Sequence, residues 1–177
     1  IEDAACAVGS AYKGKKIGSH SEIVCFSFHP RKVITTGDGG MITTSNNEYA
    51  KRLKLLRQHG MSISDTARHK SQKVLFEEHL EMGYNYRMTD IQAAVGIKQL
   101  EKLDWIISER RKIALKYHKE LKNIDCIRLP LEEKGYFSNY QSYSIYLKKN
   151  APISRNELIE KMLEKGISTR RGIMTSH

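Results

Sequence analysis

A lysine set between strand-like runs and followed by a glycine-rich turn is the feature that most constrains this chain. Residues Ile23–Phe28 are rich in β-branched and aromatic side chains and predict a buried strand. Lys32 follows soon after a proline, and residues 37–40 are mostly glycines, which adopt backbone conformations closed to other residues. The runs Val33–Thr36 and Met41–Thr44 add further strand-like sequence. This segment therefore predicts a lysine held at a turn between strands.

Lys32 has two interpretations. An amine held on a rigid turn can form a Schiff base with an aldehyde cofactor. Most lysines are instead solvated surface residues, and this chain has 30 lysine and arginine residues in total. The surrounding motifs must decide between the two.

The length and composition are those of an ordinary soluble globular protein. The chain has 177 residues, 40% apolar and 28% charged, which predicts one domain or slightly more. No apolar run approaches the length of a membrane-spanning helix, so we expect no membrane partner. The sequence begins at Ile1 in the middle of a pattern. We therefore expect it to be an internal piece of a longer protein.

The cysteines and histidines favour neither a disulfide framework nor a metal site. Cys6, Cys25 and Cys126 show no Cys-X-X-Cys spacing, which is typical of reduced thiols in a cytoplasmic protein. The seven histidines are scattered, without a metal-binding pattern. We expect a cytoplasmic protein that holds no metal.

The net charge is +10, from 30 basic and 20 acidic residues. A basic balance can indicate nucleic-acid binding, but no such motif accompanies it. The cations are spread along amphipathic helical segments such as Lys51–Arg57 and Lys98–Lys122, which favours solvated helix faces. An anionic small-molecule substrate would also fit. We expect no nucleic-acid partner.

The hydrophobic periodicity predicts an α/β chain in which long helices precede a strand–helix–strand unit. Capping signals indicate two helix starts, Thr89 with Gln92 and Ser154 with Glu157. The expected helices are Asn46–His59, Asp90–Leu103, Asp104–Lys122 and Arg155–Lys165. The expected extended segments are the start of Ile1–Val8, a hairpin at Tyr12–Gly18, Ile127–Pro130, Tyr140–Leu147 and Ile167–Ile173. Residues 61–81 predict a long irregular loop, and the change of pattern near Leu121–Asp125 predicts a domain boundary.

Two polar residues stand where functional side chains often occur. Asp3 ends a short strand-like run, which is a usual functional position in α/β sheets, although a cap is the alternative. Asn85 lies on a loop just before the helix at Asp90. Turn chemistry, with Arg87 in a surface ion pair, is the alternative for that loop.

Six motifs together resemble the DegT/DnrJ/EryC1/StrS family of sugar aminotransferases, which are fold-type I pyridoxal-phosphate enzymes. The resemblance covers nearly the whole chain. The motifs are Glu2-Asp3-Ala4-Ala5, Phe26-Ser27-Phe28-His29-Pro30-Arg31-Lys32, Thr36-Gly37-Asp38-Gly39-Gly40-Met41, Arg57-Gln58-His59-Gly60, Gly83-Tyr84-Asn85-Tyr86-Arg87-Met88-Thr89-Asp90-Ile91-Gln92-Ala93-Ala94, and Gly166-Ile167-Ser168-Thr169-Arg170.

The resemblance implies part of a three-layer α/β large domain over residues 1–122, with a mixed, mostly parallel sheet. The start of a smaller α+β C-terminal domain would occupy residues 123–177. It also implies that the family's N-terminal part, with a ring-stacking aromatic residue and a phosphate-binding loop, is absent from this sequence. We expect the 177-residue chain alone to bind pyridoxal phosphate weakly and to turn over nothing.

The family's cofactor residues transfer to named positions. Lys32 matches the Schiff-base lysine, whose freed amine moves the proton between substrate and cofactor carbons. Asp3 matches the carboxylate that keeps the pyridine nitrogen protonated. Ser27 matches the phosphate-binding serine, and Asn85 matches an asparagine that reaches the phosphate in the partner subunit. The resemblance thus implies a homodimer with a shared active site.

Four further assignments are less direct. Cys6 stands where the family usually has glutamine or histidine contacting the cofactor, and a thiol is a poor hydrogen-bond donor. His29 is a candidate for lining the site, with packing as the alternative. Arg170 and Arg171 are candidates for binding the phosphates of a nucleotide-linked sugar, with a charged surface strand as the alternative.

The resemblance implies transfer of an amino group from an amino acid, with glutamate as the expected donor, to a nucleotide-linked keto-sugar. The amino sugar would feed surface polysaccharide (such as the O-antigen of lipopolysaccharide), glycan or antibiotic assembly. One alternative is a sugar dehydratase of the same family, in which histidine replaces the lysine. The other is a non-catalytic binding module or inactive fragment, for which Cys6 and the absent N-terminal part are the support.

Overall fold

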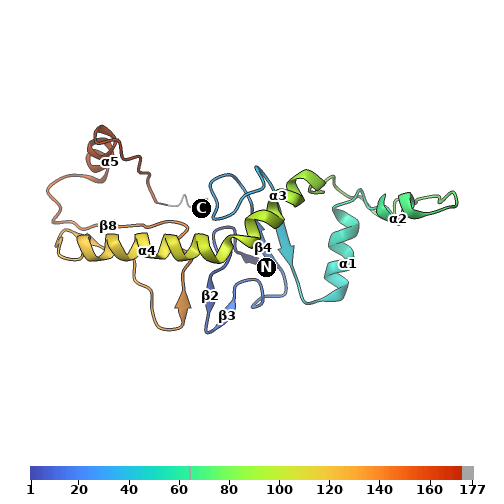
Figure 1. Cartoon of the computed structure of the whole chain (residues 1–177), viewed down its shortest axis with the longest axis horizontal. Coiled ribbons are helices and arrows are strands. Elements are labelled where there is room, and N and C mark those ends of the chain that lie inside the picture. The colour runs from blue at the N-terminus through green and yellow to red at the C-terminus, as the bar shows by residue number, and fades with distance from the viewer. Residues whose placement is uncertain (64, 173–177) are drawn as a thin grey trace.

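The computed structural model describes residues 1–63 and 65–172, and this part of the chain forms five helices and eight short strands (Figure 1). The helices are α1 (Asn47–Leu56), α2 (Asp65–Lys70), α3 (Asp90–Glu101), α4 (Leu103–Leu121) and α5 (Arg155–Glu164). The strands are β1 (Glu2–Asp3), β2 (Ala11–Tyr12), β3 (Lys15–Lys16), β4 (Val24–Ser27), β5 (Gly40–Thr43), β6 (Ile127–Arg128), β7 (Tyr136–Phe137) and β8 (Tyr146–Leu147).

The central sheet has the strand order β1-β4-β5 and is mixed. Strand β1 pairs with β4 in parallel, with Asp3 opposite Cys25. Strand β5 pairs with β4 in antiparallel fashion, with Ser27 opposite Gly40. Val24 in β4 is fully buried. The strand predicted over Ile23–Phe28 therefore forms as β4 and is the central strand of this sheet.

Two smaller sheets join segments that are far apart in the sequence. The second sheet has the order β3-β2-β7, so that Ala11 pairs with Phe137 across more than a hundred residues. The third pairs β6 with β8. Figure 1 shows the elongated helix α4 running from the central strands toward β8 and α5, whereas α1 and α2 lie on the other side, beyond α3.

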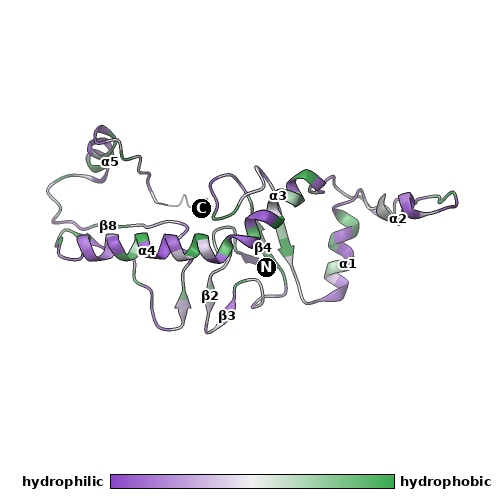
Figure 2. Cartoon of the chain, viewed as in Figure 1, coloured by the Kyte–Doolittle hydropathy of each residue, from purple (hydrophilic) through white to green (hydrophobic). Residues whose placement is uncertain are grey.

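The core forms where the central sheet meets the start of α4. Its buried members are Phe28, Val33, Ile34 and Ile107, and they pack against partly buried apolar neighbours including Met88. Large apolar side chains also remain exposed along α3 and α4. Figure 2 colours the hydrophobic residues of these helices green. These two helices thus present more apolar surface than the described part of the chain covers.

Local caps begin three helices where the sequence predicts them. The Asn46 side chain accepts two backbone N–H groups of the first turn of α1. Capping boxes begin α3, from Thr89 and Gln92, and α5, from Ser154 and Glu157. A cap of this kind contributes about 1 kcal/mol to helix stability.

The run Val33–Thr36 does not form the strand that its composition suggests. Val33, Ile34 and Thr36 are buried, and the backbone N–H of Thr36 donates to the carbonyl oxygen of Phe28 at 3.1 Å. The chain folds back against the end of β4, and these side chains fill the core without pairing in the sheet.

Other departures lie at element boundaries and in the C-terminal half. The alternating run Tyr140–Leu147 predicts a strand, but only its last two residues pair, as β8. The first residue, Tyr140, has a left-handed φ of 45°, which is not the extended backbone of a strand. Helix α1 ends at Leu56, before the predicted His59, and the loop 61–81 contains α2. Residues 167–172 form no strand, and Ile173 lies outside the described residues.

Gly60 occupies a position that an alanine cannot share. Its φ is +69°, and an added Cβ would overlap the carbonyl oxygen of Glu81. We expect Gly60→Ala to lower the free energy of unfolding by about 1–3 kcal/mol, measured by urea denaturation. Gly14→Ala is the control, because Gly14 has a φ of +78° with open space around it. An equal loss in both variants would show that backbone strain alone is responsible.

Candidate functional site

Two candidate residues lie at the same edge of the central sheet. Because β1 and β4 run in parallel, their carboxyl ends meet at one edge, which is where α/β sheets place their ligands. Asp3 is the last residue of β1, and Ser27 is the last residue of β4. Just beyond them, the buried Ala4 donates its N–H to the carbonyl oxygen of Cys25 at 2.9 Å, which extends the pairing.

A tight turn after β4 presents Lys32. The N–H of Lys32 donates to the carbonyl oxygen of His29 at 2.9 Å, and the His29 Nδ1 atom accepts the N–H of Arg31 at 3.3 Å. The N–H of His29 in turn donates to the Ser27 hydroxyl oxygen at 3.3 Å. His29 therefore shapes the turn that holds the lysine, and its role in lining the site stays a prediction.

The amine of Lys32 meets the thiol of Cys6. The Lys32 Nζ atom lies 3.1 Å from the Cys6 Sγ atom, on the loop that follows β1. On the same loop, Asp3 Oδ1 accepts the N–H of Ala5 at 2.9 Å. The structure thus brings an amine, a carboxylate, a hydroxyl and a thiol to one sheet edge, from the ends of β1 and β4 and from the loops that follow them.

Asn85 lies in a different part of the molecule. It forms an isolated antiparallel bridge with Gln58, after α1, and its side chain is exposed. The rings of Tyr84 and Tyr86 on either side stack at a centroid distance of 4.9 Å. Within the described residues, no recorded hydrogen bond joins Asn85 to Lys32.

Arg170 and Arg171 are not brought to the sheet edge by any recorded contact. Both are exposed and follow α5 in a stretch without strand structure. Across residues 1–63 and 65–172, neither takes part in a recorded hydrogen bond or ion pair with the candidate site. Their proposed substrate contacts therefore stay predictions.

Two residues that the sequence did not single out contact both loops of the site. Asn139 is 2% exposed, and its Nδ2 atom donates to the carbonyl oxygens of Cys6 and Val8, each at 2.9 Å. Gln141 Nε2 donates to the carbonyl oxygen of Arg31 at 2.7 Å. The only local signal was the run of turn-favouring residues around Asn139, which says nothing about distant partners.

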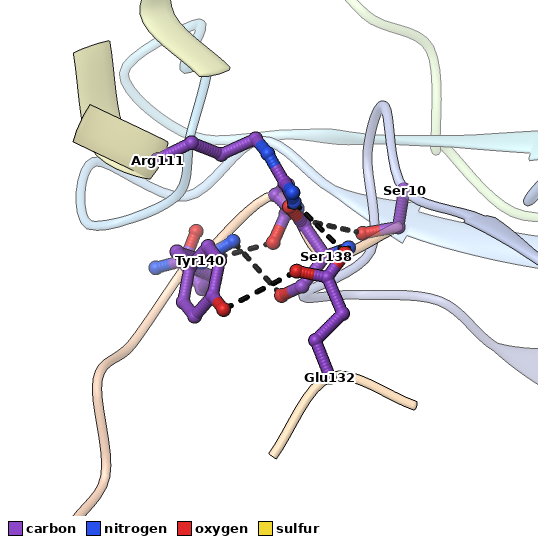
Figure 3. Close-up of polar contacts among 7 residues, drawn as sticks. Ser10, Arg111, Glu132, Ser138 and Tyr140 are labelled. Atoms are coloured by element: carbon purple, nitrogen blue, oxygen red, sulfur yellow. Dashed lines mark hydrogen bonds and ion pairs between the residues drawn. The ribbon is translucent and has the colours of Figure 1, made fainter. Parts of the chain in front are cut away.

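A polar network surrounds this segment (Figure 3). Glu132 Oε1 accepts from Arg111 Nη1 at 3.0 Å and from the N–H of Ser138 at 3.1 Å. Glu132 Oε2 accepts from the Tyr140 hydroxyl at 3.2 Å. Ser10 accepts the N–H of Asn139 at 3.1 Å. The network fixes residues 138–140 between α4 and the loop that follows β1.

The network shifts two pKa values in opposite directions. Burial alone would raise the pKa of Glu132, but hydrogen bonds from Arg111 and Ser138, with the charge of Arg111, outweigh burial and lower it. Burial raises the pKa of Tyr140, and the charge of Glu132 raises it further. Near neutral pH the network therefore contains an ionised carboxylate and a neutral phenol.

The described part of the chain contains neither a candidate metal site nor a candidate membrane-spanning helix. No group of three or more histidine, cysteine or acidic side chains is placed to hold a metal ion in residues 1–63 and 65–172. No described helix has the length and apolar character needed to cross a bilayer.

A family model described as the DegT/DnrJ/EryC1/StrS aminotransferase family matches residues 1–173. The chain belongs to this family. An uncharacterized protein of Methanocaldococcus jannaschii is 41% identical over 170 residues, which is 96% of this chain and 44% of the relative. The UDP-4-amino-4,6-dideoxy-N-acetyl-beta-L-altrosamine transaminase of Campylobacter jejuni is 37% identical over 96% of this chain and 43% of its own length. The chain thus spans less than half of the curated relatives it matches.

Solved structures of aminotransferases share the fold. Helicobacter pylori PseC, an aminotransferase of pseudoaminic acid biosynthesis, has a TM-score of 0.82 at 30% identity, over 93% of this chain and 42% of PseC. The aminotransferase TlmJ of Streptoalloteichus hindustanus has a TM-score of 0.82 at 30% identity, over 96% and 43% of the two chains. The prediction of a partial fold-type I α/β architecture is confirmed.

The lowered pKa of Glu132 predicts an acid-dependent loss of stability. The carboxylate stabilises the fold fully above its unfolded pKa, and this contribution is lost as the pH falls through the lower folded pKa. We expect Glu132→Gln to cost about 1 kcal/mol near neutral pH and to flatten the decline below about pH 5, measured by urea denaturation. The control is Glu133→Gln, at the exposed neighbouring position. A Glu132→Gln protein with the wild-type pH profile would contradict the assignment.

Proposed function

We propose that the protein to which this chain belongs transfers an amino group from an amino acid to a nucleotide-linked keto-sugar, with pyridoxal phosphate as cofactor. The observation that carries the proposal is the position of Lys32, whose amine meets the loop of Asp3 and Cys6 at the carboxyl edge of the sheet. Membership of this aminotransferase family supports the same chemistry.

The residues at the sheet edge fit this cofactor. A primary amine, a carboxylate and a hydroxyl are the groups that an aldehyde, a pyridine nitrogen and a phosphate require. Asp3 and Ser27 supply the carboxylate and the hydroxyl from the ends of adjacent parallel strands, and Lys32 supplies the amine from the turn after β4. When bound, pyridoxal phosphate supplies an electron sink for the carbon that exchanges its amino group. Spr1654 of Streptococcus pneumoniae, which is 27% identical to this chain, is solved in a PLP-form with a TM-score of 0.81.

Each residue then has a defined task. The Asp3 carboxylate would keep the ring nitrogen protonated, because a negative charge beside a pyridinium stabilises its protonated form. The Ser27 hydroxyl would donate a hydrogen bond to the phosphate. The Lys32 amine would hold the cofactor at rest and, once released, would move a proton as a general base and then as a general acid. The Cys6 thiol lies 3.1 Å from that amine and is therefore its neighbour in the site.

A relative's name and the net charge support the proposed substrate class. The Campylobacter jejuni relative is named for a UDP-linked amino sugar. A nucleotide diphosphate is anionic, and a net charge of +10 favours its approach. We assign Arg170 and Arg171 to phosphate contacts, glutamate to the donor role, and the cytoplasm as the compartment. The amino sugar product would enter surface polysaccharide, glycan or antibiotic assembly.

The role of Lys32 has a direct covalent test. Full-length protein is incubated with pyridoxal phosphate, reduced with borohydride, and digested for mass spectrometry. In the wild-type protein we expect the label on Lys32. In Lys32→Ala we expect no label at this position and an amination rate that is lower by roughly 10²–10⁴-fold, which is the effect of losing a general base. Lys149→Ala, at an exposed lysine, is the control. Glutamate added before borohydride should reduce the label; a non-catalytic binding module would keep it, and labelling of another lysine instead would refute the assignment.

We also propose a homodimer in which Asn85 completes the site of the partner subunit. The exposure of Asn85 and its lack of a recorded bond to Lys32 within the described residues support this arrangement. Equal amounts of Lys32→Ala and Asn85→Ala proteins, each inactive alone, should regain about a quarter of wild-type activity after subunit exchange, because half the dimers then contain one intact site. A Lys32→Ala and Lys32→Arg mixture is the control. No recovery after verified exchange would place Asn85 in its own subunit's site.

A further inference from the structure

Residues Ser138–Gln141, here called the clamp segment, are the only described segment that hydrogen-bonds both loops meeting at Lys32 and Cys6. On one side, Asn139 Nδ2 donates to the carbonyl oxygens of Cys6 and Val8 at 2.9 Å. Because Asn139 is 2% exposed, water cannot readily replace these bonds, and breaking them would leave the buried amide group of Asn139 without its acceptors.

On the other side, the clamp segment holds the lysine turn. Gln141 Nε2 donates to the carbonyl oxygen of Arg31 at 2.7 Å, next to Lys32 in the chain. The Gln141 Oε1 atom is buried and has no hydrogen-bond partner among the described residues. The bond to Arg31 is therefore the hydrogen bond that orients the Gln141 side chain.

The backbone of the clamp segment is strained and held in place. Tyr140 has a φ of 45°, which is uncommon for an aromatic residue. Its N–H donates to the Ser138 hydroxyl at 3.0 Å, and the N–H of Gln141 donates to Asn139 Oδ1 at 2.9 Å. This turn sends the side chains of Asn139 and Gln141 to the two different loops. Strain that the surroundings maintain is a feature of functional segments.

The clamp segment is also anchored to parts of the fold outside the two loops. The pairing of β7 with β2 fixes its start, and Arg111 and Glu132 bind the backbone of Ser138 (Figure 3). Arg110 Nη1 donates to the carbonyl oxygen of Tyr140 at 3.2 Å. The anchor therefore comes from α4 and the second sheet, and the loops are held against a fixed support.

We propose that Asn139 and Gln141 are positioning residues, which set the separation between the Lys32 turn and the Cys6 loop. Neither touches the amine. Asn139 binds backbone carbonyl oxygens of the loop that carries Cys6, and Gln141 binds a backbone carbonyl oxygen of the turn that carries Lys32. The consequence for catalysis rests on the proposed function, whereas the consequence for loop rigidity does not. Displacements of about 1 Å near reacting groups can lower rates by 10²-fold.

The test uses Gln141→Glu in the full-length protein, because glutamate keeps the shape of glutamine and replaces the N–H donor by an acceptor. Gln141→Ala, which removes the side chain, is the second variant. Gln72→Glu makes the same charge change at an exposed glutamine and is the control. Hydrogen–deuterium exchange without cofactor should become at least about threefold faster in peptides covering residues 29–34, with the α4 peptides unchanged.

A second readout separates positioning from general stability. With pyridoxal phosphate bound, the glutamate-dependent loss of borohydride-trappable label at Lys32 should slow by about tenfold or more at saturating glutamate, while the half-saturating glutamate concentration stays the same. Unchanged exchange at residues 29–34, or equal acceleration throughout the chain, would overturn the proposal. If the wild-type protein takes no label at Lys32, the proposed function fails, and the exchange data still decide on the clamp segment.

Discussion

The parallel pairing of β1 with β4 is the contact on which the candidate site depends. It sets Asp3 opposite Cys25 and brings the carboxyl ends of both strands to one sheet edge. An antiparallel pairing would place Asp3 and Ser27 at opposite ends of the sheet. The two loops that leave this edge meet through Lys32 and Cys6. The chemistry proposed here therefore follows from the direction of two very short strands.

Such short strands need support from elsewhere in the chain. Strand β1 has two residues, and its ladder alone would be weak. The burial of Ala4 and Val24 on one side, and the hydrogen bonds from Asn139 on the other, hold the loop after β1 in place. The polar network around Glu132 then fixes Asn139 itself. Stability and site geometry are thus coupled through α4.

Local signals made much of the fold predictable. The helix starts at Asn46, Thr89 and Ser154 are set by side chains within three residues, and β4 follows from its composition. The clamp segment could not be predicted from the sequence. The residues that Asn139 contacts on the first loop lie 129 residues or more away in the sequence. Tyr140, with its left-handed φ, also interrupts a run whose alternation is typical of a strand. Lys32, Asp3 and Ser27 were singled out through the family motifs, and their meeting at one edge required the strand pairing.

The pairing of β2 with β7 has a consequence for how the protein is made. The first loop of the site is completed by side chains that the ribosome adds more than a hundred residues later. Closing so long a loop costs more entropy than local pairing, and such contacts form late in folding. During synthesis β4 and the lysine turn are made first, and the hydrogen bond from Gln141 to the turn can form only after residue 141 has been added. The geometry at Lys32 is therefore complete only after residue 141 has been synthesised, and a chain that stops before this residue lacks the hydrogen bonds from Asn139 and Gln141.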